Sequence, residues 1–287
     1  MSKSNVLRVA TFNIRYDAYC GLPAPSTEKT MKTSGEKPWS SRRRKVADTI
    51  LFHRADIVGL QEVLKNQLSD LETLLGQDWQ WVGVGREDGK EADLNSNIIL
   101  QTPDIPGSKD WDSGLPRVVT QARFQDLVTG QKFWFINTHF DDKGPRSREE
   151  SAKLILQNSQ DLLKSSDIVF LTGDFNCQEV DEPYKLLTGK KYVNNNDKSQ
   201  LDHALIPFGD TRYEISNRSI ETSYGFSNTF TGFSTSIEQV RIDFIMVSNN
   251  SLEEQKIKIL NHGTMPNLYD DDLYISDHRP VIADFIF

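Results

Sequence analysis

Residues 6–14 form a strand-like segment that is apolar on both of its alternating faces. A strand of this kind is buried on two sides, so a further layer of structure must cover each face of its sheet. Comparable apolar runs recur at residues 55–60, 168–172 and 281–287, and helical patterns lie between several of them. The pattern predicts an α/β fold in which mixed sheets are covered by helices.

The remaining elements follow from periodicity and from turn residues. Further strands are expected at residues 79–84, 240–247 and 257–262, and a hairpin at residues 118–124 and 132–139. Helices are expected after Ser40-Ser41, around Leu68, Leu71 and Leu75, near residues 182–187, and from the capping-box spacing Ser147–Glu150 to about residue 163. No linker rich in Pro, Gly and Ser divides the chain, so we expect residues 1–287 to form a single domain.

The charge balance argues against non-specific binding of long nucleic acids. The chain of 287 residues has a formal net charge of −8, whereas neutralising a phosphate backbone requires clustered Lys and Arg. The clearest basic run, Arg42-Arg43-Arg44-Lys45, is interpreted as the solvated first turn of a helix, with a local basic patch as the alternative.

Cysteine content and hydropathy indicate a protein of a reducing compartment. Cys20 and Cys177 are the two cysteines, and their spacing fits neither a metal site nor a disulfide framework. The first residues form no apolar signal region, and no run approaches the ~18 apolar residues of a membrane span. We therefore expect a cytoplasmic location, with a nuclear one left open, and neither a membrane partner nor an obligate protein partner.

Polar residues stand at the ends of several of these apolar strands. Asn13 ends the first strand, and Glu62 follows the second, where a carboxylate could bind Mg²⁺ or could cap a helix. His139 ends the second strand of the hairpin and could donate to a phosphate oxygen or be structural. Asp174 and Asn176 follow residues 168–172 with period two, so they face the same side, where one could activate water and the other bind phosphate.

The C-terminal half supplies an acid and a histidine that could pair. Asp243 lies between Ile242 and Phe244, and a buried acid needs a partner. His278, in the run Ser276-Asp277-His278, is the expected partner, because a carboxylate fixes the tautomer of an imidazole and raises its basicity. Asp277 would then remain available for a metal.

Two common enzyme classes can be excluded from the motifs. Ser276, Asp277 and His278 are adjacent in sequence and cannot form a Ser–His–Asp triad among themselves. The sequence also contains neither a Gly-x-Ser-x-Gly elbow nor a phosphate-binding P-loop.

Taken in order, these segments resemble the endonuclease/exonuclease/phosphatase superfamily, which has the deoxyribonuclease-I-like fold. The motifs that carry the resemblance span the chain in the order Asn13, Gln61-Glu62, His139, Asp174-x-Asn176, Asp243 and Ser276-Asp277-His278. The resemblance implies a four-layer α/β/β/α sandwich of two mixed β-sheets. It also implies hydrolysis of a phosphoester with Mg²⁺ or Mn²⁺.

The resemblance assigns a role to each motif residue. Glu62 is the expected metal ligand, assisted by Asn13 and Asp277. The phosphoryl oxygens would be bound by Asn176 and His139. Water activation falls to Asp174 or to His278 held by Asp243, and the sequence leaves that choice open. Either a phosphorylated small molecule or a single-stranded nucleic acid or nucleotide would suit as the substrate.

One segment departs from the pattern of similar proteins. These usually carry a further strand pair between the equivalents of residues 89–92 and 102–109, whereas here only residues 93–101 intervene. The departure predicts the loss of a strand or strand pair from one sheet. It also raises an alternative function, a catalytically impaired binding scaffold with the same fold.

Overall fold

The computed structural model describes residues 6–19, 35–83, 85, 96–98, 109–164, 167–190, 205–215 and 223–287. Two mixed β-sheets form its centre. The first has five strands in the order β2 (Ile57–Gln61), β1 (Val6–Asn13), β11 (Val281–Ile286), β10 (Lys258–Thr264) and β8 (Tyr224–Gly225). The second has six, in the order β3 (Ser96–Ile98), β4 (Val118–Gln125), β5 (Lys132–His139), β6 (Ile168–Asp174), β9 (Asp243–Ser248) and β7 (Phe208–Asp210).

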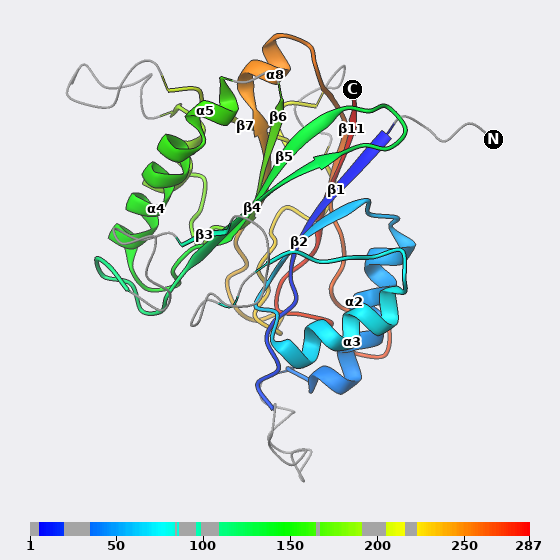
Figure 1. Cartoon of the computed structure of the whole chain (residues 1–287). Coiled ribbons are helices and arrows are strands. Elements are labelled where there is room, and N and C mark those ends of the chain that lie inside the picture. Colours follow the sequence, from blue (N-terminus) through cyan, green and yellow to red (C-terminus); the bar gives the residue numbers. More distant parts are fainter. Residues whose placement is uncertain are drawn as a thin grey trace.

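The helices cover the outer face of each sheet. The first sheet packs on α2 (Trp39–Phe52) and α3 (Lys65–Leu75), and the second packs on α4 (Pro145–Asn158), α5 (Gln160–Leu163) and α6 (Glu182–Leu187). Figure 1 shows α2 and α3 on one side of the paired sheets and α4 on the other. A short helix, α8 (Asn249–Glu253), follows β9. The architecture is the predicted α/β/β/α sandwich.

Strands alternate between the two packing surfaces, as period two requires. On β1, Leu7 and Val9 belong to the apolar cluster between the sheets, whereas Phe12 packs towards α2 and α3. On β6, Phe170 lies between the sheets and Leu171 packs towards the helices of the second sheet. Both faces of these strands are therefore buried, which explains their continuous apolar sequence.

The strand expected at residues 79–84 is not present over residues 79–83, and Val84 lies outside the described residues. A strand requires a neighbour for its backbone hydrogen bonds, and no described strand pairs with this segment. The shortened segment 93–101 lies mostly outside the described residues. Its residues Ser96–Ile98 form β3, which pairs with β4 at the edge of the second sheet.

The predicted start of α4 at Ser147 is wrong. The helix begins at Pro145, after Gly144 as N-cap. A distant carboxylate satisfies the first turn instead, since Asp112 accepts hydrogen bonds from the backbone N–H of Arg146 at 3.2 Å and of Ser147 at 2.7 Å. The local capping pattern was outweighed by this tertiary contact.

The interpretation of residues 42–45 as a solvated turn is wrong for Arg42. Its side chain is fully buried, whereas Arg44 is exposed. The Arg42 guanidinium donates to the carbonyl oxygens of Ile14 at 2.8 Å and of Ile275 at 2.7 Å. It also donates to those of Lys37 at 2.9 Å and of Arg15 at 3.2 Å. Arg42 therefore ties α2 to the end of β1 and to the segment before Ser276.

None of the helices in the described part of the chain is long and apolar enough to span a bilayer.

Candidate active site

The strand registers bring the predicted residues to one end of the sandwich. In the second sheet His139 on β5 lies opposite Asp174 on β6, and Asp174 lies opposite Asp243 on β9. In the first sheet Asn13 on β1 lies opposite Gln61 on β2, the residue before Glu62. The ends of six strands, including β11 beside β1, therefore meet around a common space.

Asn13 connects the two sheets within the site. Its Nδ2 donates to Asp174 Oδ2 at 3.0 Å and to Glu62 Oε1 at 3.2 Å. Its Oδ1 accepts from the backbone N–H of Arg15 at 3.0 Å. In this arrangement the amino group of Asn13 orients both carboxylates, while its oxygen fixes the turn that follows β1.

The chain leaves these strands through residues with left-handed backbone. The φ angles are +58° at Arg15, +63° at Glu62 and +47° at Asn176. A non-glycine residue in this region costs about 1 kcal/mol, so other contacts must offset the strain. For Glu62, the backbone N–H of Tyr16 donates to Oε2 at 3.1 Å. These sharp turns hold the side chains of Arg15, Glu62 and Asn176 at this end of the sandwich.

His278 and Asp243 form the predicted buried pair. The His278 Nδ1 lies 2.9 Å from Asp243 Oδ2, and its Nε2 lies 3.5 Å from Asp174 Oδ2. Phe230 packs edge-on against the imidazole, with 5.0 Å between ring centroids. Burial lowers the pKa of His278, but the two carboxylates outweigh burial and raise the pKa well above its usual value. The ring is therefore held with its Nε2 towards Asp174, and its protonated form is favoured.

His139 is held by its neighbours on the second sheet. Asn176 Nδ2 lies 3.0 Å from His139 Nε2 and donates to the carbonyl of Phe140 at 2.9 Å. Asp174 Oδ2 lies 3.4 Å from the same nitrogen of His139. Burial lowers the pKa of His139 and raises the pKa of Asp174. These polar groups converge on one small volume.

Glu62 and Asp277 face a common cationic position. The guanidinium of Arg15 lies 3.8 Å from Glu62 Oε2 and 4.0 Å from Asp277 Oδ2. Burial, together with the charge of Glu62, raises the pKa of Asp277. Burial also acts to raise the pKa of Glu62, but His139, hydrogen-bond donors and Arg15 outweigh it and lower that pKa. Two partly buried carboxylates with oxygen donors fit a hard divalent cation.

A second acidic group could also hold a cation. Potential ligand atoms of Asp174, Asp243 and His278 lie within 4.8 Å of one another. The short contact between Asp243 and the Nδ1 of His278 already commits one of these nitrogens to a hydrogen bond, so the group is better explained as a histidine–aspartate pair.

Ser276 has a structural role in this arrangement. Its buried hydroxyl donates to the carbonyl of Asn13 at 2.6 Å and accepts from the backbone N–H of His278 at 3.1 Å. The hydroxyl joins the turn that carries Asp277 to the end of β1. The geometry agrees with the exclusion of a serine nucleophile.

The comparison with known families supports the same interpretation. A model of the Endonuclease/Exonuclease/phosphatase family matches residues 10–278. The chain belongs to this family. No curated protein matches the chain.

Solved structures of the family share the fold over their whole length. An endonuclease/exonuclease/phosphatase from Bacteroides vulgatus is 29% identical, with 99% of each chain covered and a TM-score of 0.77. A mannosyl-6-phosphatase from Bacteroides thetaiotaomicron is 26% identical, with 98% of this chain and 100% of that chain covered and a TM-score of 0.77. D. rerio TDP2 complexed with single strand DNA product is 14% identical, with coverage of 99% and 100% and a TM-score of 0.63, and shows the fold alone.

Sequence reasoning indicated Arg117 as part of a substrate wall but missed the contacts of Arg15 with Glu62 and Asp277. Arg15 lies two residues beyond Asn13, but its φ of +58° takes it out of the extended strand, so strand periodicity gave no signal for it. Arg117 is almost fully buried, and its guanidinium contacts Asp141 Oδ2 at 3.3 Å and Asp142 Oδ1 at 2.8 Å. These contacts tie the loop before β4 to the segment after His139, and nothing local in the sequence indicates them.

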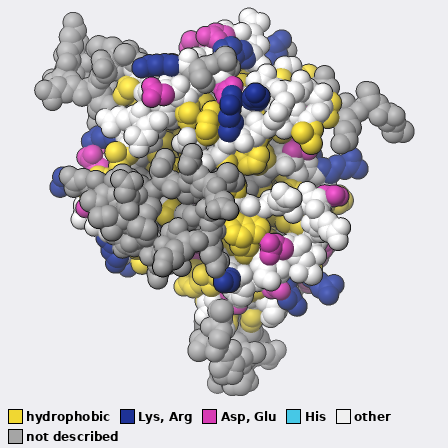
Figure 2. Space-filling view, viewed as in Figure 1, with side chains coloured by type: hydrophobic (Ala, Val, Ile, Leu, Met, Phe, Trp, Pro, Cys, Tyr) yellow, Lys and Arg dark blue, Asp and Glu magenta, His cyan; other side chains and the backbone are white. Residues whose placement is uncertain are grey.

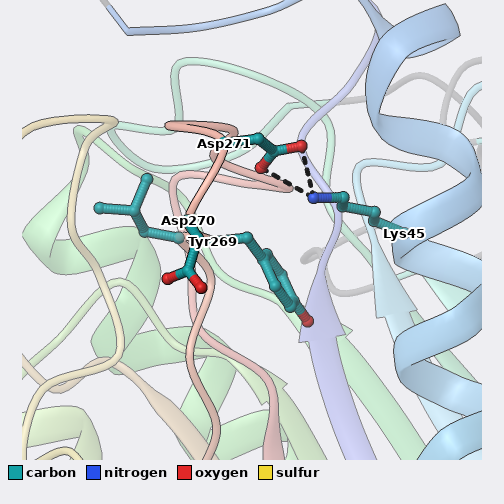
Figure 3. A pocket seen from close by; sticks show the side chains of 5 residues that line it. Lys45, Tyr269, Asp270 and Asp271 are labelled. Atoms are coloured by element: carbon teal, nitrogen blue, oxygen red, sulfur yellow. Dashed lines mark hydrogen bonds and ion pairs between the residues drawn. The ribbon is translucent and has the colours of Figure 1, made fainter.

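A surface hollow of about 410 Å³ lies elsewhere and contains none of the predicted residues. Figure 3 shows Lys45, Tyr269, Asp270 and Asp271 on its wall, with Lys45 paired to both carboxylate oxygens of Asp271 at 2.8 and 2.7 Å. The pair satisfies its own charges at an exposed position, so this hollow is no rival for the site between the sheets.

Proposed function

We propose that this protein hydrolyses a phosphoester with the help of Mg²⁺ or Mn²⁺, by in-line attack of an activated water. The observation that carries the proposal is the bridge made by Asn13, which joins Glu62 of the first sheet to Asp174 of the second. Through this bridge the proposed cation-binding carboxylate and the proposed water-activating carboxylate share one space. Family membership supports phosphoester hydrolysis as the reaction class.

In the proposed site, Glu62 and Asp277 hold the cation, and Asn13 orients Glu62. A bound divalent cation would neutralise charge that develops on the phosphoryl oxygens. His139 and Asn176 bind these oxygens, because their polar atoms converge beside Asp174.

The proton transfer is assigned to Asp174 and His278 together. Asp174 Oδ2 lies within 3.5 Å of both His139 Nε2 and His278 Nε2, so it can align a water. Asp243 keeps the His278 ring oriented and charged, which favours stabilisation of the transition state and protonation of the leaving oxygen.

For the substrate, we propose a small phosphorylated molecule such as a sugar phosphate. The mannosyl-6-phosphatase at 26% identity supports this class. On the face seen in Figure 2, Lys and Arg side chains are scattered among acidic ones and form no continuous stripe over the described residues. A long nucleic acid would need such a stripe for its phosphates.

The alternative of an impaired scaffold has less support. Its motivation was the shortened segment 93–101, and none of the proposed site residues lies there. Hydrogen bonds or ion pairs link Asn13, Glu62, Asp174 and His278 across both sheets, an arrangement that a binding scaffold would not require.

The test is hydrolysis by the purified protein of p-nitrophenyl phosphate, bis-p-nitrophenyl phosphate, hexose 6-phosphates and single-stranded oligonucleotides. Each is measured with Mg²⁺, with Mn²⁺ and with EDTA. We expect divalent-dependent turnover, with a preference for the monoesters. Preference for the oligonucleotides would overturn the substrate class, and activity that survives EDTA would overturn the metal.

Matched variants locate the activity. Glu62→Gln should lower turnover by about 10²-fold or more, since it removes a charge from the proposed metal site. Glu72→Gln is the control, because Glu72 lies on the exposed face of α3, where its carboxylate accepts a hydrogen bond from Trp81 Nε1. Equal turnover in both variants would refute the assignment of Glu62.

A further inference from the structure

A layer of polar side chains lies directly beneath the proposed active site. On β1, β5 and β6, the residue two positions before the site residue on the same face is polar, and those before it are apolar. The rows run Leu7, Val9, Thr11, Asn13 on β1; Phe133, Phe135, Asn137, His139 on β5; and Ile168, Phe170, Thr172, Asp174 on β6. The polar layer therefore separates the apolar cluster between the sheets from the site.

Two carboxamides join the sheets within this layer. Gln61 Nε2, on the first sheet, donates to Asn137 Oδ1, on the second sheet, at 2.7 Å. Asn137 Nδ2 returns a hydrogen bond to the carbonyl of Leu60 at 3.0 Å. The hydroxyl of Thr172 lies 3.1 Å from Asn137 Oδ1, and that of Thr11 accepts from Gln61 at 3.0 Å. We call Gln61 and Asn137, with the two hydrogen bonds that join β2 to β5 through them, the inter-sheet clamp.

The backbone of β2 is adapted to the clamp at Gly59. A Cβ atom there would lie 2.3 Å from Asn137 Oδ1 and 2.6 Å from the hydroxyl of Thr172. No larger residue fits without displacing the carboxamide. Glycine within a strand destabilises that strand by roughly 0.5–1 kcal/mol. We therefore attribute the glycine at position 59 of β2 to the room that the Asn137 side chain needs.

The clamp differs in kind from the packing around it. In the apolar cluster beneath this layer, the contacts between the sheets are non-directional. Hydrogen bonds between carboxamides depend on distance and angle, so they fix how one sheet sits against the other. Gln61 immediately precedes Glu62, and Asn137 lies two residues before His139. The clamp therefore acts at the point where the cation-binding and phosphate-binding groups meet.

We propose that the inter-sheet clamp is a positioning device that couples the cation-binding half of the site, on the first sheet, to the phosphate-binding half, on the second. Gln61 and Asn137 touch neither substrate nor cation in this role. The proposal rests on the proposed function, because it requires a divalent cation and a phosphate to bind side by side.

The test measures coupling in place of activity. Mn²⁺ binding is titrated calorimetrically with and without saturating inorganic phosphate, for the wild type and for Asn137→Leu and Gln61→Met, which keep size and remove the carboxamides. In the wild type, phosphate should tighten Mn²⁺ binding about tenfold or more, within the usual range of coupling between sites. In both variants, Mn²⁺ alone should bind within about threefold of wild type, while the enhancement by phosphate falls below about threefold.

The control separates coupling from simple loss of stability. Val9→Ala truncates a buried side chain of the same inter-sheet surface, away from the clamp. It should unfold more easily and keep the full enhancement. If neither carboxamide variant folds, the same titration is made on Thr172→Val, which removes only a hydroxyl beside Asn137. In this variant too the enhancement of Mn²⁺ binding by phosphate should fall.

Each result has a distinct meaning. Clamp variants that keep the wild-type enhancement would overturn the positioning role and leave the proposed function intact. A wild type that binds both Mn²⁺ and phosphate, but in which phosphate does not tighten Mn²⁺ binding, would also overturn the positioning role and leave the proposed function intact. A wild type that binds no Mn²⁺ would remove the metal from the proposed function, and the coupling with it.

Discussion

Protonation of His262 should destabilise the fold in mild acid. This histidine on β10 is 2% exposed, and its Nδ1 lies 2.8 Å from the hydroxyl of Thr211. That hydroxyl donates to the carbonyl of Ile245 at 2.8 Å, so Nδ1 carries the proton and Nε2 is the unprotonated nitrogen. Nε2 is buried and has no hydrogen-bond partner among the described residues. Burial, reinforced by the cation of Arg241, lowers the pKa of His262 to about 3.

The size of the effect follows from the two pKa values. The pKa of the folded state is below that of the unfolded chain, about 6.5, so the unfolded state binds the proton first. The stabilisation is therefore complete above about pH 6.5 and is lost as the pH falls towards 3. Between about pH 7.5 and about pH 5 the loss is about 2 kcal/mol, because each unit below the unfolded pKa costs about 1.4 kcal/mol.

The assay compares the wild type with His262→Asn, whose amide can still donate to Thr211. Urea unfolding at about pH 7.5 and about pH 5 gives the free energy of unfolding of each protein. Other groups titrate equally in both, so the difference isolates His262. The stability advantage of the wild type should shrink by about 2 kcal/mol at the lower pH. A change below about 0.5 kcal/mol would refute the assignment of a buried, neutral His262.

Three further outcomes are expected. Arg42→Met should lower the free energy of unfolding by about 3 kcal/mol, because two fully buried carbonyl acceptors lose their donor. Arg44→Met, on the exposed face of α2, should change it by less than about 0.5 kcal/mol. Equal values for the two variants in urea unfolding would contradict this. Gly59→Ala should reduce the midpoint of thermal unfolding and the turnover together, because the added Cβ would lie 2.3 Å from Asn137 Oδ1. An unchanged thermal midpoint and unchanged steady-state kinetics would refute the tight packing at this position. Asp243→Asn should lower kcat by about 10²-fold or more with unchanged circular dichroism, because its histidine partner loses the carboxylate that orients it.

The strands and their polar ends could be predicted from the sequence because both are local. Alternation along β1 and β6 follows from strand geometry, and the sequence placed Asn13 and Asp174 at the ends of these two apolar strands. The hydrogen bond between Asp243 and His278 was predicted from the burial of an acid among apolar neighbours, and it is present at 2.9 Å. The order of the motifs predicted the family to which the chain belongs.

Other features depend on residues far apart in the sequence. The first turn of α4 is satisfied by Asp112, so the local capping box at Ser147 had no role. The segment 79–83 has strand-like composition, but a strand forms only where a neighbour supplies hydrogen bonds, and no described strand does so here.

The sequence by itself determined which faces of the strands are buried and which residues end them, because period two and residue polarity act over a few positions. The tertiary structure alone decided the burial of Arg42 among four carbonyl groups and the contact of Gln61 with Asn137 across the sheets. Such contacts join residues up to 233 positions apart in the chain. Their partners are set by how the sheets and helices pack, and no local pattern records that arrangement.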